Sequence, residues 1–95
     1  MNHAERIVEE DRRQVLLAAL LVSPGYKLPV RALRERADLV GYVASVDRVR
    51  TDCAWLDEQG LVVLDAEAAT LTERGAAAAL GQITVPGVRR PLPGA

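Results

Sequence analysis

The feature that most constrains the fold is an uninterrupted apolar run at residues 15–22, near the start of a 95-residue chain. The run ends a segment, 4–22, that contains no Gly or Pro and is rich in helix-forming residues. A surface helix shows one apolar stripe, whereas the second half of this segment is apolar around its whole circumference. We therefore expect a helix whose last two turns are covered on more than one side. The run is much shorter than the roughly 20 residues that a membrane span requires, so we expect no membrane association.

The composition is that of one small domain. Hydrophobic residues make up 49% of the chain and charged residues 26%, which is ordinary for a folded domain and too apolar for a disordered one. The net charge is −1, so no overall basic field indicates a nucleic-acid partner. The single cysteine, Cys53, excludes an internal disulfide and is typical of a reducing compartment. Acidic residues stand where a signal peptide would be basic and then apolar, so we expect a cytoplasmic protein.

A second helix is predicted after Ser23, Pro24 and Gly25, which end the first. Residues 26–28 form a short extended stretch, and Pro29 suits the first position of the helix that follows. Gly41 then ends this helix as a C-terminal cap. The apolar face of the helix is predicted to carry Val30, Leu33, Ala37 and Val40.

A third helix is bounded by two strong local signals. Ser45 is a favourable N-cap, and Gly60 supplies the left-handed residue that ends a helix. Leu61 can then pack back on Leu56, as expected of a Schellman cap. The buried face is predicted to carry Val46, Val49, Cys53 and Leu56.

Two short β-prone runs, 61–64 and 69–71, predict a hairpin that turns at 65–68. Thr72 can cap a fourth helix that runs to about residue 80. Gly75 inside this helix costs about 1 kcal/mol relative to Ala, which indicates close approach to another helix. Beyond Gly81 the chain becomes rich in Pro and Gly.

The order helix, strand, helix, helix, two-stranded hairpin, helix (α-β-α-α-β-β-α) is that of a winged helix-turn-helix domain, mainly α with a small β-hairpin. Residues 55–63 (Trp-Leu-Asp-Glu-Gln-Gly-Leu-Val-Val) and 71–75 (Leu-Thr-Glu-Arg-Gly) look like the corresponding segments of many bacterial winged-helix regulators. Residues 49–62 and the segment 85–91 are similar to small proteins of Mu-like phages and prophages, which are labelled as arsenic-repressor-type regulators. The resemblance implies a non-enzymatic phage protein, with a winged-helix domain at 1–81 and an extended tail at 82–95. It makes transcription regulation the expected role and double-stranded DNA a candidate partner.

In this family the third helix enters the major groove and the wing contacts phosphate. The outward face of the predicted helix carries Asp47, Arg48, Thr51, Trp55 and Glu58. Arg48 is the best candidate for base reading, because a guanidinium group can bind the edge of guanine with two hydrogen bonds. The full set of candidate DNA contacts is Lys27, Arg31, Arg34, Tyr42, Ser45, Arg48, Arg50 and Thr51.

The distribution of charge leaves a second interpretation open. Residues 26–50 hold six Lys and Arg against three Asp and Glu, a net charge of +3, but residues 51–73 hold six acidic residues and no Lys or Arg. The acidic wing tip, 65–68, has the wrong sign to contact a DNA backbone. The alternative is therefore a protein-interaction adaptor in phage assembly or replication. Such an adaptor would present Trp55 and the acidic hairpin to a basic phage protein.

Trp55 is exposed on the helical wheel, and a bare indole is unusual on a surface. It is either an anchor for a partner or covered by the chain's own tail, with Val85, Pro86 or Val88 across the ring. The apolar first helix leaves a similar choice. It forms a homodimer interface through Leu16, Leu17, Leu20 and Leu21, or it is buried by the fourth helix and the tail of its own chain.

No constellation for catalysis or metal binding stands out. His3 lies near the terminus and Cys53 on a buried face, so no nucleophile pair with a histidine base is expected. One Cys and one His are too few for the metal sites of metal-sensing regulators, and no glycine-rich phosphate loop is present. We expect no enzyme activity, no metal and no cofactor.

Overall fold

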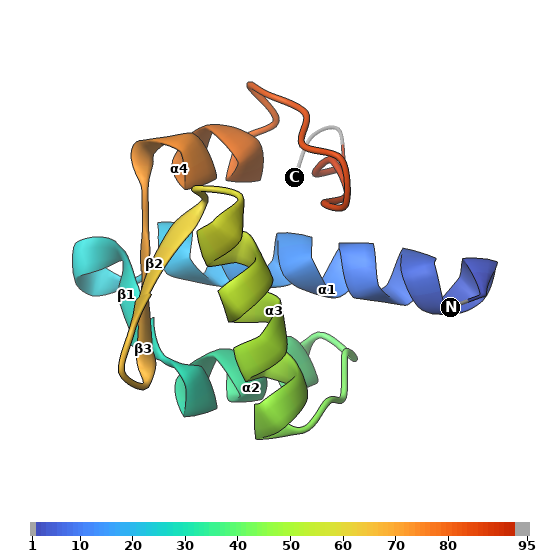
Figure 1. The fold of residues 1–95 in the computed structure, drawn as a ribbon, viewed down its shortest axis with the longest axis horizontal. Helices are drawn as coiled ribbons and strands as arrows, with labels where there is room; N and C mark the ends of the chain where they lie inside the picture. The colour runs from blue at the N-terminus through green and yellow to red at the C-terminus, as the bar shows by residue number, and fades with distance from the viewer. Residues whose placement is uncertain (1, 93–95) are drawn as a thin grey trace.

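Residues 2–92, which the computed structural model describes, form four α-helices and a three-stranded antiparallel sheet (Figure 1). A 3₁₀ turn at Pro24–Tyr26 joins the first helix to the first strand. The elements are α1 (His3–Leu21), β1 (Lys27–Pro29), α2 (Val30–Leu39), α3 (Val46–Glu58), β2 (Val62–Asp65), β3 (Ala68–Leu71) and α4 (Glu73–Ala79). This order agrees with the predicted one, so the fold is mainly helical with a small sheet, consistent with a winged helix.

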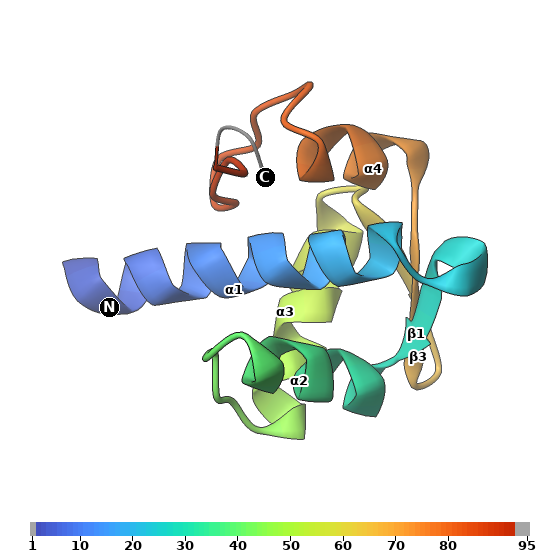
Figure 2. The same ribbon diagram turned by 180° about the vertical axis from the view of Figure 1, so that it is seen from behind.

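Helix α1 is the central element of the fold. In Figure 1 it runs across the molecule with α4 above it, α2 below it and α3 crossing in front, and Figure 2 shows the same helix from behind. Leu16, Leu17 and Leu20 are fully buried among these neighbours. The N-terminal half of α1 extends beyond the body of the molecule in both views. The apolar run is thus covered on several sides by its own chain.

The sheet has the order β1-β3-β2, so the first strand joins the predicted hairpin. Leu28 pairs with Ala69 across β1 and β3. The hairpin turns tightly at Ala66, which adopts a left-handed φ of 55°. The backbone carbonyl of Glu67 at this turn accepts a hydrogen bond of 2.7 Å from the N–H of Val30. The wing tip is thereby held against the first residue of α2.

The predicted boundaries of α3 are confirmed. The Ser45 hydroxyl accepts a hydrogen bond of 3.0 Å from the backbone N–H of Arg48. At the other end Gly60 has a φ of 75°, and the N–H of Leu61 donates to the carbonyl of Leu56 at 2.9 Å. This bond is the long-range half of a Schellman cap. The cap fixes where the chain leaves α3 to enter the hairpin.

Helix α4 begins as predicted, because the Thr72 side chain accepts a hydrogen bond from the N–H of Gly75. We expected Gly75 to allow close approach to another helix, and this expectation was wrong. A Cβ at this position would lie 1.9 Å from the backbone carbonyl oxygen of Leu61. The close approach is therefore to the chain entering the hairpin, not to another helix.

Three expectations around β1 and α2 were also wrong. Val40 is exposed, because the helix ends at Leu39 and the i+10 position no longer faces the core. Pro29 is the last residue of β1 and the N-cap of α2, so it precedes the first helical position. Tyr26 belongs to the 3₁₀ turn, with a left-handed φ of 57°, and the strand begins one residue later.

The tail after α4 packs against the rest of the chain as far as it is described. Val85 and Val88 are buried and belong to the hydrophobic core. Arg89 binds the carboxylate of Asp11 on α1 through two contacts, at 2.9 and 3.1 Å. Residues 93–95 of the predicted tail lie outside the described residues.

Candidate nucleic-acid interface

The N-terminal end of α3 is exposed to solvent on one side, and the opposite side of the helix packs against the core. Val49, Cys53 and Leu56 fix the helix in the core, and the serine cap at its start defines its direction. Burial, and to a lesser extent the negative charge of Asp52, raises the pKa of the Cys53 thiol to about 12. The thiol is therefore a neutral core group.

Arg48 keeps the freedom that a base-reading side chain needs. Its side chain is 54% exposed, and its ionic partner is Glu9 on α1, with 3.9 Å between Arg48 Nη1 and Glu9 Oε2. Glu9 is itself bound more closely by Arg13, whose Nη2 lies 2.8 Å from Glu9 Oε1. An ion pair 3.9 Å long, with an arginine that is half exposed to solvent, contributes little stability. The Arg48 guanidinium can therefore leave Glu9 for another acceptor at low cost.

Arg50, in contrast, is already bound on two sides. Its Nη1 lies 2.7 Å from Asp47 Oδ1, one turn earlier on α3. Its Nε and Nη2 donate to the two carboxylate oxygens of Glu67 at the wing tip, at 3.2 and 2.5 Å. These bonds raise the pKa of Arg50, with the Glu67 bond as the largest cause. They lower the pKa of Glu67 in turn, and the charge of Arg31 adds to that effect.

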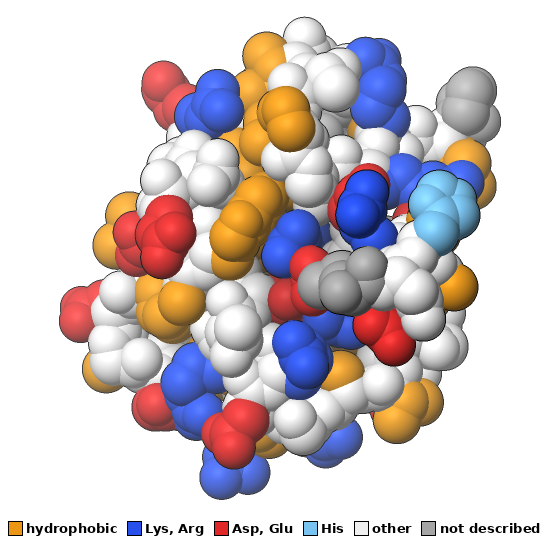
Figure 3. All heavy atoms as spheres, turned by 45° about the vertical axis from the view of Figure 1, so that its right-hand side comes forward, with side chains coloured by type: hydrophobic (Ala, Val, Ile, Leu, Met, Phe, Trp, Pro, Cys, Tyr) orange, Lys and Arg blue, Asp and Glu red, His pale blue; other side chains and the backbone are white. Residues whose placement is uncertain are grey.

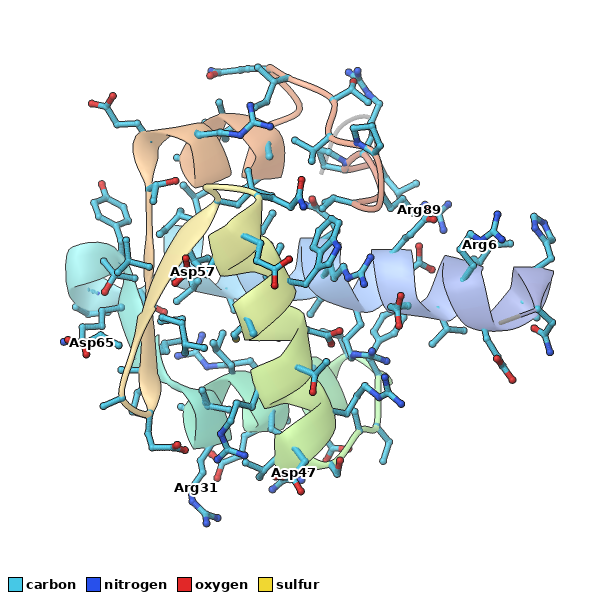
Figure 4. All side chains as sticks on the ribbon, in the orientation of Figure 1. Arg6, Arg31, Asp47, Asp57, Asp65 and Arg89 are labelled. Carbon is cyan, nitrogen blue, oxygen red and sulfur yellow. The ribbon has the colours of Figure 1, made fainter. Side chains whose placement is uncertain are left out.

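Three other candidate contacts have unengaged side chains. Within residues 2–92, no ion pair or side-chain hydrogen bond involves Lys27, Arg31 or Arg34. Lys27 and Arg31 are exposed and Arg34 is half-buried. Figure 4 shows Arg31 pointing away from α2 into solvent at the lower edge of the molecule. Lys27 on β1 and the two arginines on α2 thus offer cationic groups near the start of α2.

The remaining polar candidates are used within the chain. The Tyr42 hydroxyl donates a hydrogen bond of 3.2 Å to Asp11 on α1, and its pKa is raised first by burial and then by that bond and charge. The Thr51 hydroxyl donates to the backbone carbonyl of Asp47 at 3.0 Å. Ser45 is engaged as the cap of α3. These residues orient the local structure, and Tyr42 joins the loop before α3 to α1.

The surface around the candidate site has mixed charge. In Figure 3 the Lys and Arg side chains are interspersed with Asp and Glu and do not form a continuous basic patch. Asp47 lies almost fully exposed beside Arg48 on α3, and Asp65 on the wing is exposed as well. Figure 4 places Asp65 on the side of the wing away from α1. The wing therefore contributes negative charge, as its sequence predicts.

A buried ion pair joins α1 to α3, and sequence reasoning missed it. Asp52 is 1% exposed and Arg12 is 7% exposed. Arg12 Nε and Nη2 donate to the two carboxylate oxygens of Asp52, at 2.5 and 3.2 Å. A signal was present, since Asp52 lies one turn after Val49 and one turn before Leu56 on the buried face. A charged residue at such a position requires a buried partner.

Trp55 is covered from two sides and is half-buried. The guanidinium carbon of Arg13 lies 3.9 Å from the centroid of the indole ring, a cation–π contact. A Cβ at Gly87 would lie 2.7 Å from two ring carbons, so the tail backbone rests directly on the ring. Arg13 Nη1 also donates to the Gly87 carbonyl at 2.9 Å. The prediction that the chain's own tail covers Trp55 is therefore confirmed, and the closest approach is at Gly87, between the predicted residues Pro86 and Val88.

The predicted homodimer interface on α1 is wrong for three of its four residues. Leu16, Leu17 and Leu20 are fully buried in the core of their own chain, which leaves them no surface for a partner. Leu21 is half-buried at the end of α1. The sequence correctly indicated burial on several sides, but the covering elements come from the same chain.

Large aliphatic side chains are exposed at the end of α2 and in the connection from α2 to α3. Leu39 is 81% exposed, Val40 is 59% exposed and Val43 is 79% exposed. Sequence reasoning missed these exposed side chains, because the apolar periodicity of the second helix predicted that Val40 is buried. We call these three residues the connection patch.

In the described part of the chain, no group of three or more His, Cys, Asp or Glu side chains is placed to hold a metal ion. None of the described helices combines the length and apolar character needed to cross a membrane.

Two known proteins are similar to this chain. Uncharacterized protein gp26 of Escherichia phage Mu is 38% identical over 91 residues, which cover 92% of this chain and 94% of that protein. An uncharacterized protein of Haemophilus influenzae is 34% identical over 61 residues, which cover 64% of this chain and 59% of that protein. No protein-family model and no solved structure matches the chain. The chain belongs to the family of the phage Mu protein gp26.

Proposed function

We propose that this phage-type protein is a non-enzymatic, regulator-like module that binds double-stranded DNA through α2 and the N-terminal half of α3. The observation that carries the proposal is the placement of unengaged cationic side chains at this surface. Lys27, Arg31 and Arg34 have no partner within residues 2–92, and Arg48 has only a weak one. Exposed cations without carboxylate partners are the groups that displace counterions from DNA phosphates.

Each residue has a distinct part in the proposed complex. Arg48 lies in the first turns of α3 and reads a base edge in the major groove. Lys27, Arg31 and Arg34 bind backbone phosphates and set the orientation of the domain. The acidic wing supplies no cation to the backbone contacts, which distinguishes this protein from winged helices that use a basic wing.

The proposed complex is a homodimer on two half-sites about one DNA turn apart. Because the core leucines of α1 are buried, we place the dimer contact on the exposed apolar residues at the end of α1 and on α4. A groove of about 640 Å³ lies there, and its lining includes Leu21, Val22, Leu80 and Leu92. Light scattering of the wild-type protein should give twice the chain mass. Leu80→Glu should give the monomer mass, whereas Leu39→Glu, an equally drastic change at an exposed leucine elsewhere, should leave the dimer intact.

The DNA proposal is tested by fluorescence anisotropy of a labelled mixed-sequence duplex across a salt series. We expect binding that strengthens as salt falls and weakens about tenfold in Arg48→Ala. Arg6→Ala is the matched control, because Arg6 is exposed on α1 and its side chain points to the side of that helix opposite α2 (Figure 4). Equal affinity of the two variants, or wild-type binding that does not respond to salt, would contradict the proposal.

A second candidate function is a protein-interaction adaptor, and the connection patch favours it. Three large aliphatic side chains exposed within five residues are unusual on a free surface and typical of contact sites. Trp55 no longer supports this role, since the tail and Arg13 cover it. Immobilised wild-type protein should then retain a specific phage protein from induced cells, and Val43→Lys should not retain it. Equal retention by both proteins would count against the adaptor.

A further inference from the structure

The wing tip and the cationic surface meet at one ion-pair cluster, formed by Arg50, Glu67 and Asp47. The Glu67 carboxylate receives two hydrogen bonds from the Arg50 guanidinium. It also lies within the electrostatic reach of Arg31, one of the unengaged cations. Glu67 and Asp47 keep 65% and 92% of their side chains exposed. A carboxylate with two oxygens on one guanidinium has the geometry with which arginine also binds a phosphate group.

The backbone holds Glu67 at this place. Its carbonyl accepts the hydrogen bond from Val30 at the first residue of α2, and the left-handed residue Ala66 closes the tight turn before it. The internal carboxylate thus occupies a position that Arg50, through two hydrogen bonds, and Arg31, through its charge, make favourable for an anion.

We propose that Glu67 occupies a backbone-phosphate site on this surface and acts as an internal competitor for DNA at Arg50. This inference rests on the proposed function, because it assigns the regulation of the same DNA-binding surface. On binding, a phosphate oxygen replaces the Glu67 carboxylate at Arg50, and the carboxylate turns into solvent. The exchange forms and breaks only ion pairs. The free protein therefore binds DNA more weakly than its cationic side chains alone would allow.

The test compares Glu67→Gln with Asp65→Asn in anisotropy titrations of the same labelled mixed-sequence duplex. Both substitutions remove one negative charge from the same hairpin and conserve shape, but no ion pair or side-chain hydrogen bond of Asp65 is present within residues 2–92. We expect Glu67→Gln to tighten binding roughly three- to tenfold at low salt and to leave the slope of the salt dependence unchanged, because the same phosphate binds Arg50 in both complexes. Asp65→Asn should change affinity by less than about twofold and leave the slope unchanged. Adding Arg50→Ala to Glu67→Gln should remove the gain.

The outcomes separate this inference from the function on which it rests. If the wild-type protein binds the duplex but Glu67→Gln and Asp65→Asn tighten binding equally, general charge explains the gain and the inference is wrong. A gain that persists without Arg50 overturns it as well. If neither the wild-type protein nor any variant binds the duplex at low salt, the proposed function and the inference both fail.

Discussion

Because Arg12 and Asp52 form a buried ion pair, we predict that removing the charge of Asp52 strongly lowers the free energy of unfolding. Asp52→Asn keeps the size and shape of the side chain but removes its charge. The Arg12 guanidinium then stays almost fully buried without a counter-charge, because Asp52 is its ion-pair partner in the structure. Arg13 is affected too, since its Nε lies 3.9 Å from Asp52 Oδ1. Removing one member of a buried ion pair costs about 3–5 kcal/mol.

The size of this effect is large for such a chain. A domain of 95 residues has a free energy of unfolding of about 5–14 kcal/mol, at roughly 0.05–0.15 kcal/mol per residue. The substitution should therefore remove between about a fifth and all of the stability. Replacing both partners with apolar residues, as Arg12→Met with Asp52→Leu, should come within about 2 kcal/mol of the wild-type value, because no charge is left buried.

Urea unfolding followed by circular dichroism measures these differences. Asp47→Asn is the matched control, since Asp47 lies on the same helix with its side chain 92% exposed. We expect this control to change the free energy of unfolding by no more than about 0.5 kcal/mol. If Asp52→Asn destabilises the protein no more than Asp47→Asn does, the buried pair is not the link between α1 and α3 that we describe.

Three further predictions follow from single residues. Burial raises the pKa of the Cys53 thiol to about 12, so the free energy of unfolding should fall as the pH rises from about 9 to about 12; pH-dependent urea unfolding should show this fall in the wild-type protein and a clearly smaller fall in Cys53→Ala, where the raised pKa of Tyr42 still contributes. Gly75→Ala should lower the unfolding midpoint because its Cβ would strike a backbone carbonyl, and a stabilised variant, as helix propensity alone predicts, would refute the clash. Gly87→Ala should lift the tail from the indole ring and shift the fluorescence emission of Trp55, the one tryptophan, to the red. Gly41→Ala is the control, because Gly41 has the same φ of 94° with open space around it, and it should leave the emission unchanged. Equal spectra of the two variants would show that the tail does not cover the indole.

Local signals in the sequence predicted the elements of the fold well. Ser45, Gly60 and Thr72 each act within one turn of their own position, through a cap or a left-handed φ. Such features depend on neighbouring residues alone, so one sequence is enough to find them. Val40 shows the limit of periodicity, because the pattern continues beyond the residue where the helix ends.

The candidate site was harder to predict because it depends on pairs between distant segments. Arg50 and Glu67 are 17 residues apart and Arg12 and Asp52 are 40 residues apart. Charge counting treated Arg50 as a free cation, whereas the fold brings a wing carboxylate to it. The leucines of α1 could not be assigned a partner for a similar reason. Their apolar pattern predicts that they are buried, but it does not show which element covers them. These partners are set by tertiary packing.

The central claim is that α2 and the start of α3 form the DNA-binding surface. Amide NMR spectra of the isotopically labelled protein, recorded while a mixed-sequence duplex is added at low salt, test it residue by residue. We predict that the shifts concentrate on the amides of residues 30–36 and 45–51 and that raising the salt concentration reverses them. Unchanged spectra, or shifts confined to α4 and residues 85–90, would contradict the claim.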